Sequence, residues 1–172
     1  KFKLYDFQYD VLKEYQENDY NVILKSRQLG ISTLSAAYAL WMMLFHNDKN
    51  VLCIATTKDT AKNIVTKVRI MYDGLPVWLK TQIVENNKLS LVFKNGSQIK
   101  ALASTESAGR SEALSLLILD EAAFIEKIDV IWTAAQQTLA TGGQCLAIST
   151  PNGVGNWFLG ILLIHHIENH II

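Results

Sequence analysis

Four short apolar runs, separated by longer helical patterns, most constrain the fold of this 172-residue chain. The runs predict buried strands over 21–24, 51–55, 116–119 and 145–148. Apolar spacing predicts helices over 6–17, 32–45, 59–71 and 128–139. Strands alternating with helices are typical of an α/β domain around a mainly parallel sheet. Because ligands bind such sheets beyond the carboxyl ends of the strands, functional residues are expected directly after Leu24, Ala55, Leu119 and Ile148.

A β-hairpin is expected between the second and third of these strands. Alternating apolar residues over 89–93 and 98–102 flank the dipeptide Asn95-Gly96. Asn and Gly both tolerate positive φ, which tight hairpin turns require, so this pattern is a strong hairpin signal. We therefore predict an antiparallel hairpin inserted into the otherwise parallel fold.

Composition adds little about partners. Lys plus Arg and Asp plus Glu number 16 each, so the net charge neither favours nor excludes a polyanion. Cys53 and Cys145 lie in apolar runs and are expected to be buried and reduced, which fits a cytosolic setting. The apolar run 157–164 is shorter than the roughly 20 residues of a membrane-spanning helix, so no membrane association is expected.

The segment Lys25-Ser-Arg-Gln-Leu-Gly-Ile-Ser32 connects the first predicted strand to a long helix. Backbone N–H groups at such a helix start bind anions, helped by the helix dipole. The standard phosphate-binding loop reads Gly, four residues, Gly, Lys, then Ser or Thr. Here Gly30 and Ser32 fit, but Lys25 takes the first Gly position and Ile31 takes the lysine position. Two interpretations stay open: a strand–helix turn with solvated Lys25 and Arg27, or a loop whose lysine reaches the phosphates from its start.

Two carboxylates, Asp120 and Glu121, directly follow the apolar run 116–119. In nucleotide-hydrolysing sites such an Asp holds Mg²⁺, and the following Glu orients and deprotonates the attacking water. The alternative is an ordinary strand end followed by an acidic helix cap. The order of the loop and the acidic pair, both after buried strands, favours the nucleotide site.

Three segments together resemble the ATPase domain of the large terminase subunit of tailed bacteriophages with contractile tails. They are 26–30 followed by Ser32 and Thr33, Leu-Asp-Glu-Ala-Ala-Phe over 119–124, and Ser-Thr-Pro-Asn-Gly over 149–153. The resemblance runs from about Tyr5 to Phe158. It implies a P-loop NTPase fold of the additional-strand, catalytic-glutamate class, related to RecA and helicase motors, with a mainly parallel sheet flanked by helices.

The resemblance also implies an activity and partners. It implies hydrolysis of ATP, with Mg²⁺, coupled to translocation of double-stranded viral DNA into a procapsid. The implied partners are double-stranded DNA, the phage portal protein and the small terminase subunit, with the chain in a homo-oligomeric ring on the portal. The implied location is the host cytoplasm during virion assembly.

Site residues carry over position by position. Glu121 and Lys25 would be catalytic, Ser32 and Asp120 would hold the metal, and Ser149 and Thr150 would couple the phosphate to DNA gripping. Arg27 and Arg110 resemble arginines that stabilise charge on the transferred phosphoryl group, unless they are plain surface residues. Tyr5 and Gln8 resemble an adenine-reading motif, unless Gln8 is an exposed helix-start residue. The expected nucleotide-binding residues are Tyr5, Gln8, Lys25, Ser26, Arg27, Gln28, Leu29, Gly30, Ile31, Ser32 and Thr33.

Two departures from the family limit these expectations. Many relatives carry Lys where Ile31 stands, although other terminases place it where Lys25 stands. The segment 159–172 does not resemble the family, so we expect an ATPase domain over 1–158, an atypical tail, and no nuclease domain or DNA cleavage. Two alternatives stay open: a superfamily 2 helicase-like ATPase lobe, and a nucleotide-binding module without hydrolysis. The presence of Glu121 disfavours the second, because binding alone needs no water-activating base.

Overall fold

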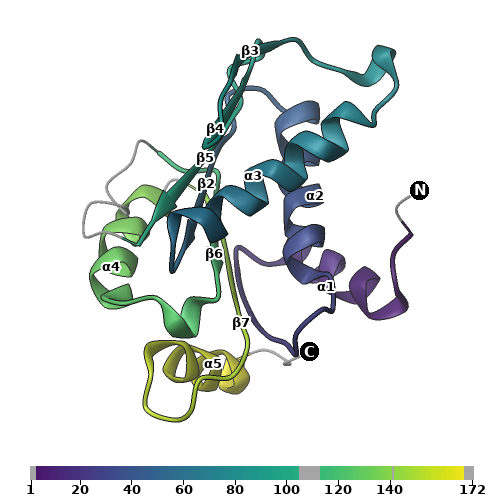
Figure 1. Cartoon of the computed structure of the whole chain (residues 1–172). Coiled ribbons are helices and arrows are strands. Elements are labelled where there is room, and N and C mark those ends of the chain that lie inside the picture. Colours follow the sequence, from purple (N-terminus) through teal and green to yellow (C-terminus); the bar gives the residue numbers. More distant parts are fainter. Residues whose placement is uncertain (1–2, 105–112, 141, 169–172) are drawn as a thin grey trace.

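The computed structural model describes residues 3–104, 113–140 and 142–168, and it folds around one seven-stranded sheet (Figure 1). The strands are β1 (Tyr20–Leu24), β2 (Asn50–Ala55), β3 (Ile83–Asn86), β4 (Ser90–Phe93), β5 (Gln98–Ala103), β6 (Leu116–Asp120) and β7 (Gln144–Ser149). The helices are α1 (Asp6–Glu17), α2 (Ile31–Phe45), α3 (Lys58–Asp73), α4 (Ile128–Leu139) and α5 (Trp157–Glu168), with short 3₁₀ helices η1 (Val77–Leu79) and η2 (Ala122–Phe124).

The sheet has the order β1-β7-β6-β2-β5-β4-β3, and its first five strands in this order are parallel. Leu24 at the end of β1 pairs with Ser149, and Asp120 at the end of β6 pairs with Ile148. The carboxyl ends of β1, β7 and β6 therefore lie side by side. The prediction of a mainly parallel α/β sheet is confirmed, and the four predicted strands are in it.

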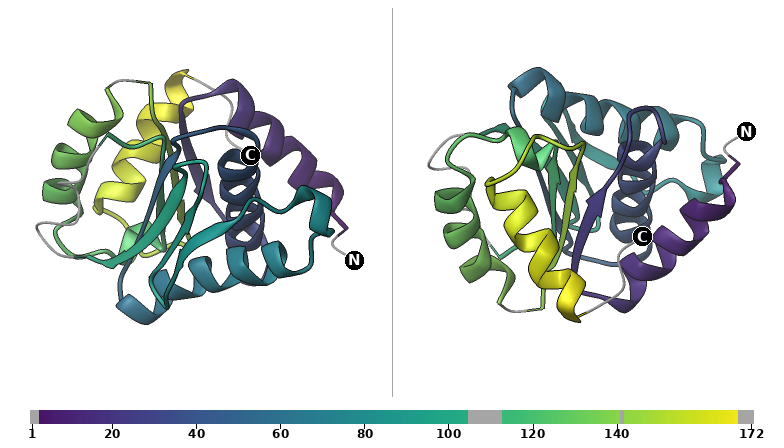
Figure 2. Two further views of the ribbon diagram at one scale, coloured as in Figure 1. Left: turned by 90° about the horizontal axis from the view of Figure 1, so that it is seen from above. Right: turned by 90° about the horizontal axis from the view of Figure 1, so that it is seen from below.

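Helices cover both faces of the sheet, which explains why its central strands carry continuous apolar runs (Figure 2). On one face, residues of α1, α2 and α3 pack against Val51, Cys53, Leu116 and Ile118. On the other face, residues of α4 and α5 join a second core cluster. Alternate residues of β2 and β6 therefore belong to different cores.

The predicted hairpin is present as β4 and β5, which pair antiparallel, but it is part of the main sheet. β5 also pairs with β2 in parallel, and β3, which the sequence pattern did not predict, extends the sheet beyond β4. In the turn only Gly96 has positive φ (+81°), and its N–H donates to the Phe93 carbonyl at 3.1 Å. The Asn95 side chain donates instead to the carbonyls of Met43 and His46, so it ties the turn to the end of α2.

Cys53 and Cys145 are buried and free, as predicted. Among the residues that the structure describes, no helix has the length and apolarity to cross a membrane.

Replacing Gly96 with Ala is expected to destabilise the domain by about 1–2 kcal/mol, because a left-handed conformation strains any residue with a Cβ. The new Cβ would also meet the Asp48 carboxylate. Urea denaturation measures the change in the free energy of unfolding. Gly160→Ala in α5 is the matched control: its Cβ meets nothing within 4 Å, so the change should be neutral or stabilising. Equal stability of the two variants would contradict this account of the turn.

Candidate active site

The loop between β1 and α2 turns sharply at Gly30, which has a φ of +74°. The Gly30 carbonyl accepts hydrogen bonds from Thr33 and Leu34, so α2 begins directly after it. The first N–H groups of a helix have no partner within the helix and point toward its start. A Cβ at Gly30 would meet Nε2 of Gln8 at 2.8 Å, so close packing also favours glycine at this position.

A cavity of about 270 Å³ opens beside this loop. Its lining consists of Lys25, Gln28, Leu29, Gly30, Ile31, Ser32, Thr33 and Lys67. All but the last were predicted from the sequence as nucleotide-binding residues. Lys67 comes from α3, and no motif pointed to it. Ser26 and Arg27, the remaining predicted loop residues, are exposed.

Ser32 and Asp120 meet across the strand ends: the Ser32 hydroxyl donates to Oδ1 of Asp120 at 3.1 Å. Burial raises the pKa of the Asp120 carboxyl, and the Ser32 hydrogen bond and the Lys25 charge only partly offset this effect. A hydroxyl and a carboxylate are hard oxygen ligands of the kind that Mg²⁺ prefers. Within the described residues no group of three His, Cys, Asp or Glu side chains is placed to hold a metal. The pair therefore suits an ion that takes its other ligands from phosphate and water.

The Glu121 carboxylate accepts hydrogen bonds from both Lys25 and Thr150. The Glu121 backbone has a φ of 55°, which turns the chain sharply between β6 and η2. One carboxylate oxygen accepts from Nζ of Lys25 at 3.0 Å. The other accepts from the N–H of Thr150 at 3.2 Å and from its hydroxyl at 3.0 Å. Burial raises the pKa of Glu121, but the hydrogen bonds from Lys25 and Thr150 outweigh it, so the net pKa is lowered and Glu121 is an anion at neutral pH.

The end of β7 supplies further contacts to the same place. The Ser149 hydroxyl accepts from the N–H of Ala123 and donates to the Thr150 carbonyl. The Ser149 carbonyl accepts from the N–H of Lys25 at 3.0 Å. The strand end that carries Ser149 and Thr150 thus touches both the loop after β1 and the turn after β6. The structure brings this predicted coupling pair to the site.

Gln8 is buried rather than exposed, with 2% of its surface accessible. Its amide oxygen accepts from the N–H of Tyr5, and its amide nitrogen donates to the Leu29 carbonyl at 2.9 Å. The interpretation of Gln8 as an exposed helix-start residue is therefore wrong, because it supports the loop directly. The Tyr5 side chain is exposed and stacks on Phe7. Adenine recognition by either residue stays a prediction, and Arg110 lies outside the described residues.

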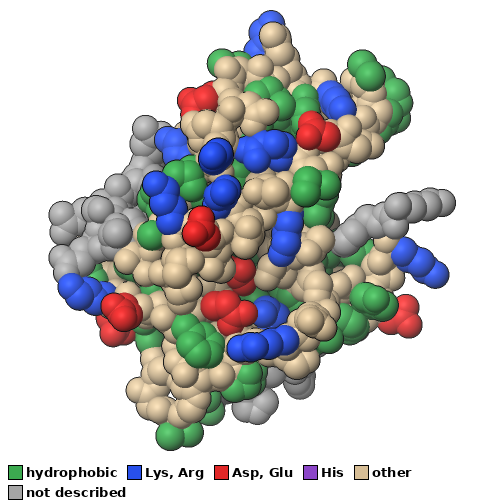
Figure 3. Space-filling view, viewed as in Figure 1, with side chains coloured by type: hydrophobic (Ala, Val, Ile, Leu, Met, Phe, Trp, Pro, Cys, Tyr) green, Lys and Arg blue, Asp and Glu red, His purple; other side chains and the backbone are tan. Residues whose placement is uncertain are grey.

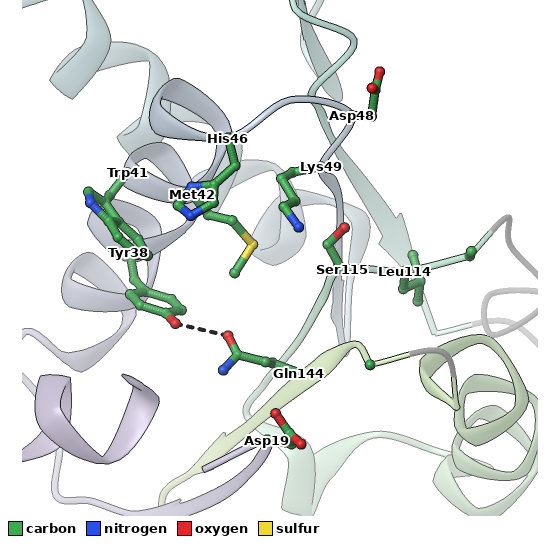
Figure 4. A pocket seen from close by; sticks show the side chains of 12 residues that line it. Asp19, Tyr38, Trp41, Met42, His46, Asp48, Lys49, Leu114, Ser115 and Gln144 are labelled. Atoms are coloured by element: carbon green, nitrogen blue, oxygen red, sulfur yellow. Dashed lines mark hydrogen bonds between the residues drawn. The ribbon is translucent and has the colours of Figure 1, made fainter. Parts of the chain in front are cut away.

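A larger cavity, about 390 Å³, lies at the other end of the strands (Figure 4). Tyr38, Trp41 and His46 from α2 and its end line one side, and Gln144 at the start of β7 lies across from them. The Tyr38 hydroxyl donates to the Gln144 amide oxygen at 2.9 Å. This cavity is at the amino ends of the strands and contains none of the predicted residues. We assign the active site to the smaller cavity, because the loop, both carboxylates and Lys25 converge there.

The loop and the acidic turn both lie within the part of the chain that matches a known family. A family model described as "Terminase large subunit, T4likevirus-type, N-terminal" matches residues 22–169. The match begins after Tyr5 and Gln8 and extends past 158, into the segment expected to be atypical. The division of the chain at 158 stays a prediction.

Solved structures share the fold at low sequence identity. The large terminase ATPase domain of Thermus phage P74-26 has a TM-score of 0.77 and 24% identity, over 94% of this chain and 70% of that chain. The large terminase of bacteriophage D6E in complex with ADP has a TM-score of 0.75 and 17% identity, over 99% of this chain and 44% of that chain. The large terminase of bacteriophage HK97 has a TM-score of 0.76 and 20% identity, over 97% of this chain and 37% of that chain. The chain spans less than half of the D6E and HK97 proteins.

Replacing Asp120 with Asn is expected to stabilise the domain at pH 7 in the absence of nucleotide and Mg²⁺. Because the pKa of Asp120 is raised in the fold, its ionised form costs more free energy in the folded chain than in the unfolded chain. The gain should disappear as the pH falls below the ordinary aspartate pKa of about 3.9, where both states are protonated. Urea denaturation across this pH range measures it.

The exposed Asp10 of α1 provides the control for that experiment. Asp10→Asn keeps the same change in charge without the burial, so it should not reproduce the gain. A loss of stability in Asp120→Asn at pH 7 would contradict the assignment of a desolvated carboxylate at the end of β6.

Proposed function

Because the chain belongs to the family of N-terminal domains of T4-like large terminase subunits, we propose that it hydrolyses ATP to drive double-stranded viral DNA into a procapsid. The observation that carries the proposal is the 3.1 Å hydrogen bond between Ser32 and Asp120. These residues are 88 positions apart, and the bond joins a phosphate-loop hydroxyl to the acidic end of β6. In nucleotide-hydrolysing enzymes these two groups share one magnesium ion.

The loop after β1 binds the phosphates of ATP in this proposal. Backbone N–H groups around Gly30 and the start of α2 face the phosphates, and the helix dipole favours negative charge there. The D6E large terminase, which shares the fold, is solved in complex with ADP, and this supports nucleotide binding by this chain. Ser32 and Asp120 would hold Mg²⁺, which would neutralise phosphate charge.

Lys25 provides the phosphate-binding ammonium from the start of the loop. Its side chain is 9% exposed and lies in the same cavity as Gly30 and Ser32. Its present partner is Glu121, at 3.0 Å. Phosphate oxygens compete with that carboxylate for the ammonium, so nucleotide binding frees one oxygen of Glu121. The unusual position of the lysine is thus compatible with the chemistry.

Glu121 acts as the general base. Its lowered pKa keeps it ionised at neutral pH, so it can accept a proton from the attacking water. Thr150 holds the second carboxylate oxygen through two hydrogen bonds and so fixes the orientation of the base. Through the same contacts, the end of β7 responds to a movement of Glu121, and Ser149 and Thr150 thereby couple the phosphate to the rest of the motor. Arg27, exposed on the loop, and Arg110 are the candidates for stabilising transferred charge.

Double-stranded DNA is the proposed cargo, although the chain has no net charge. Lys and Arg side chains gather over α3 and the neighbouring strands on one face of the molecule, a distribution that supports a polyanionic partner (Figure 3). The portal protein, the small terminase subunit and further copies of the chain in a ring complete the proposed machine in the host cytoplasm. Family membership favours this role over a helicase lobe. The contacts of Glu121 favour hydrolysis over nucleotide binding alone.

Glu121→Gln is expected to retain nucleotide binding and to lower phosphate release from ATP by about 100-fold or more, because the amide cannot accept the water proton. Lys25→Ala is expected to weaken both nucleotide binding and hydrolysis. Phosphate release and fluorescent-nucleotide binding are measured together in the presence of double-stranded DNA.

Lys13→Ala is the matched control, because Lys13 forms an exposed pair with Glu17 on α1 and does not line the cavity. It should behave as the wild type. Wild-type rates in Glu121→Gln would refute the assignment of the base. Wild-type binding and rates in Lys25→Ala would refute the relocated lysine.

A further inference from the structure

Lys67 is a cation of the phosphate-loop cavity that the sequence motifs did not identify. It is half-buried on α3 and lines the cavity together with Lys25, Gly30 and Ser32. Its neighbours Val65 and Val68 on α3 are fully buried in the core shared with α2. The backbone at Lys67 is therefore held firmly, and only the flexible end of its side chain is able to move within the cavity.

The cavity lacks a lysine at the usual phosphate-binding position, and Lys67 is a second cation in its lining. The position that normally carries the phosphate-binding lysine is Ile31, which is apolar and 2% exposed. Lys25 already has a carboxylate partner in Glu121. Among the described residues, none forms a hydrogen bond or ion pair with the Lys67 ammonium. In the part of the chain that the structure describes, Lys67 is thus a cavity cation without a direct carboxylate partner.

The acidic end of β6 adjoins the cavity that this lysine lines. Ser32, which lines the cavity together with Lys67, donates its hydroxyl to Asp120 at 3.1 Å. Asp120 and Ser32 are the proposed ligands of Mg²⁺, which would accompany the terminal phosphates of ATP. Because Lys67 and the proposed metal ligand Ser32 line one cavity, the terminal phosphates are the part of ATP that Lys67 would contact.

We propose that Lys67 is a second phosphate-binding cation of this site, donating from α3 to the terminal phosphates of ATP beside Asp120. The inference rests on the proposed function, because it requires a nucleotide in the cavity. It assigns to α3 the ammonium that Ile31 cannot supply, and it shares the triphosphate charge between Lys67 and Lys25. A DNA backbone is a poorer fit for the same lysine, because a cavity of about 270 Å³ does not admit a duplex.

The test is equilibrium binding of fluorescent ATP and ADP analogues with Mg²⁺ to the wild type, Lys67→Ala, Lys67→Gln and Lys67→Arg. Loss of a charge-assisted contact is expected to weaken ATP binding by about tenfold or more in the Ala and Gln variants, with a smaller loss for ADP. Lys67→Arg should recover most of the affinity, since it restores the cation. Lys62→Ala, a lysine of α3 that does not line the cavity, is the matched control and should bind as the wild type.

The outcomes separate this inference from the proposed function. If the wild type binds neither nucleotide, the proposed function fails and the inference fails with it. If the wild type binds ATP and both neutral Lys67 variants bind it equally well, the function stands and the inference is overturned. Weakened binding of double-stranded DNA with unchanged nucleotide affinity would also overturn it and would assign Lys67 to the cargo. Circular dichroism checks the fold of each variant, and Lys67→Gln keeps most of the aliphatic stem if Lys67→Ala does not fold.

Discussion

The ion pair between Lys25 and Glu121 joins the ends of β1 and β6, which β7 separates in the sheet. Thr150 at the end of β7 bonds to the same carboxylate, so three adjacent strand ends share one anion. Because the Lys25 side chain is only 9% exposed, removing its charge from water is costly unless the ammonium is paired and hydrogen-bonded. The parallel sheet, packed on both faces, supplies the rigidity that holds these groups together. The site therefore depends on the register of its strands as much as on the identity of its residues.

The central fold followed from the sequence because its signals are local. Strands buried on both faces are continuously apolar, and the run 116–119 needed no other information. The edge was harder to predict. β3 has only one partly buried apolar residue, Ile83, and its other residues are exposed, so its pairing with β4 depends on neighbours that the pattern cannot reveal. Asn95-Gly96 did mark a hairpin, but Asn95 bonds to the end of α2, a contact between segments far apart in sequence.

In the candidate site too, some residues could be predicted from local sequence signals and others could not. The sequence predicted the residues that lie at or shortly after a strand end, because a parallel sheet brings such ends together. They are Lys25, Ser32, Asp120 and Glu121. Lys67 was not predictable, because its place at the loop comes from the packing of α3 against α2 and not from a motif. The burial of Gln8 likewise depends on how α1 meets the loop. Helix packing adds residues to the site that strand patterns alone do not reveal.

The ammonium of Lys25 is proposed to bind the phosphates of ATP although Lys25 stands at the start of the loop. A crystal structure with Mg²⁺ and a non-hydrolysable ATP analogue tests it most directly. The account predicts that Nζ of Lys25 contacts an oxygen of the β- or γ-phosphate and that Glu121 faces a water beside the γ-phosphate. It would be contradicted if the analogue bound at the loop while Lys25 remained paired with Glu121 and out of reach of every phosphate oxygen.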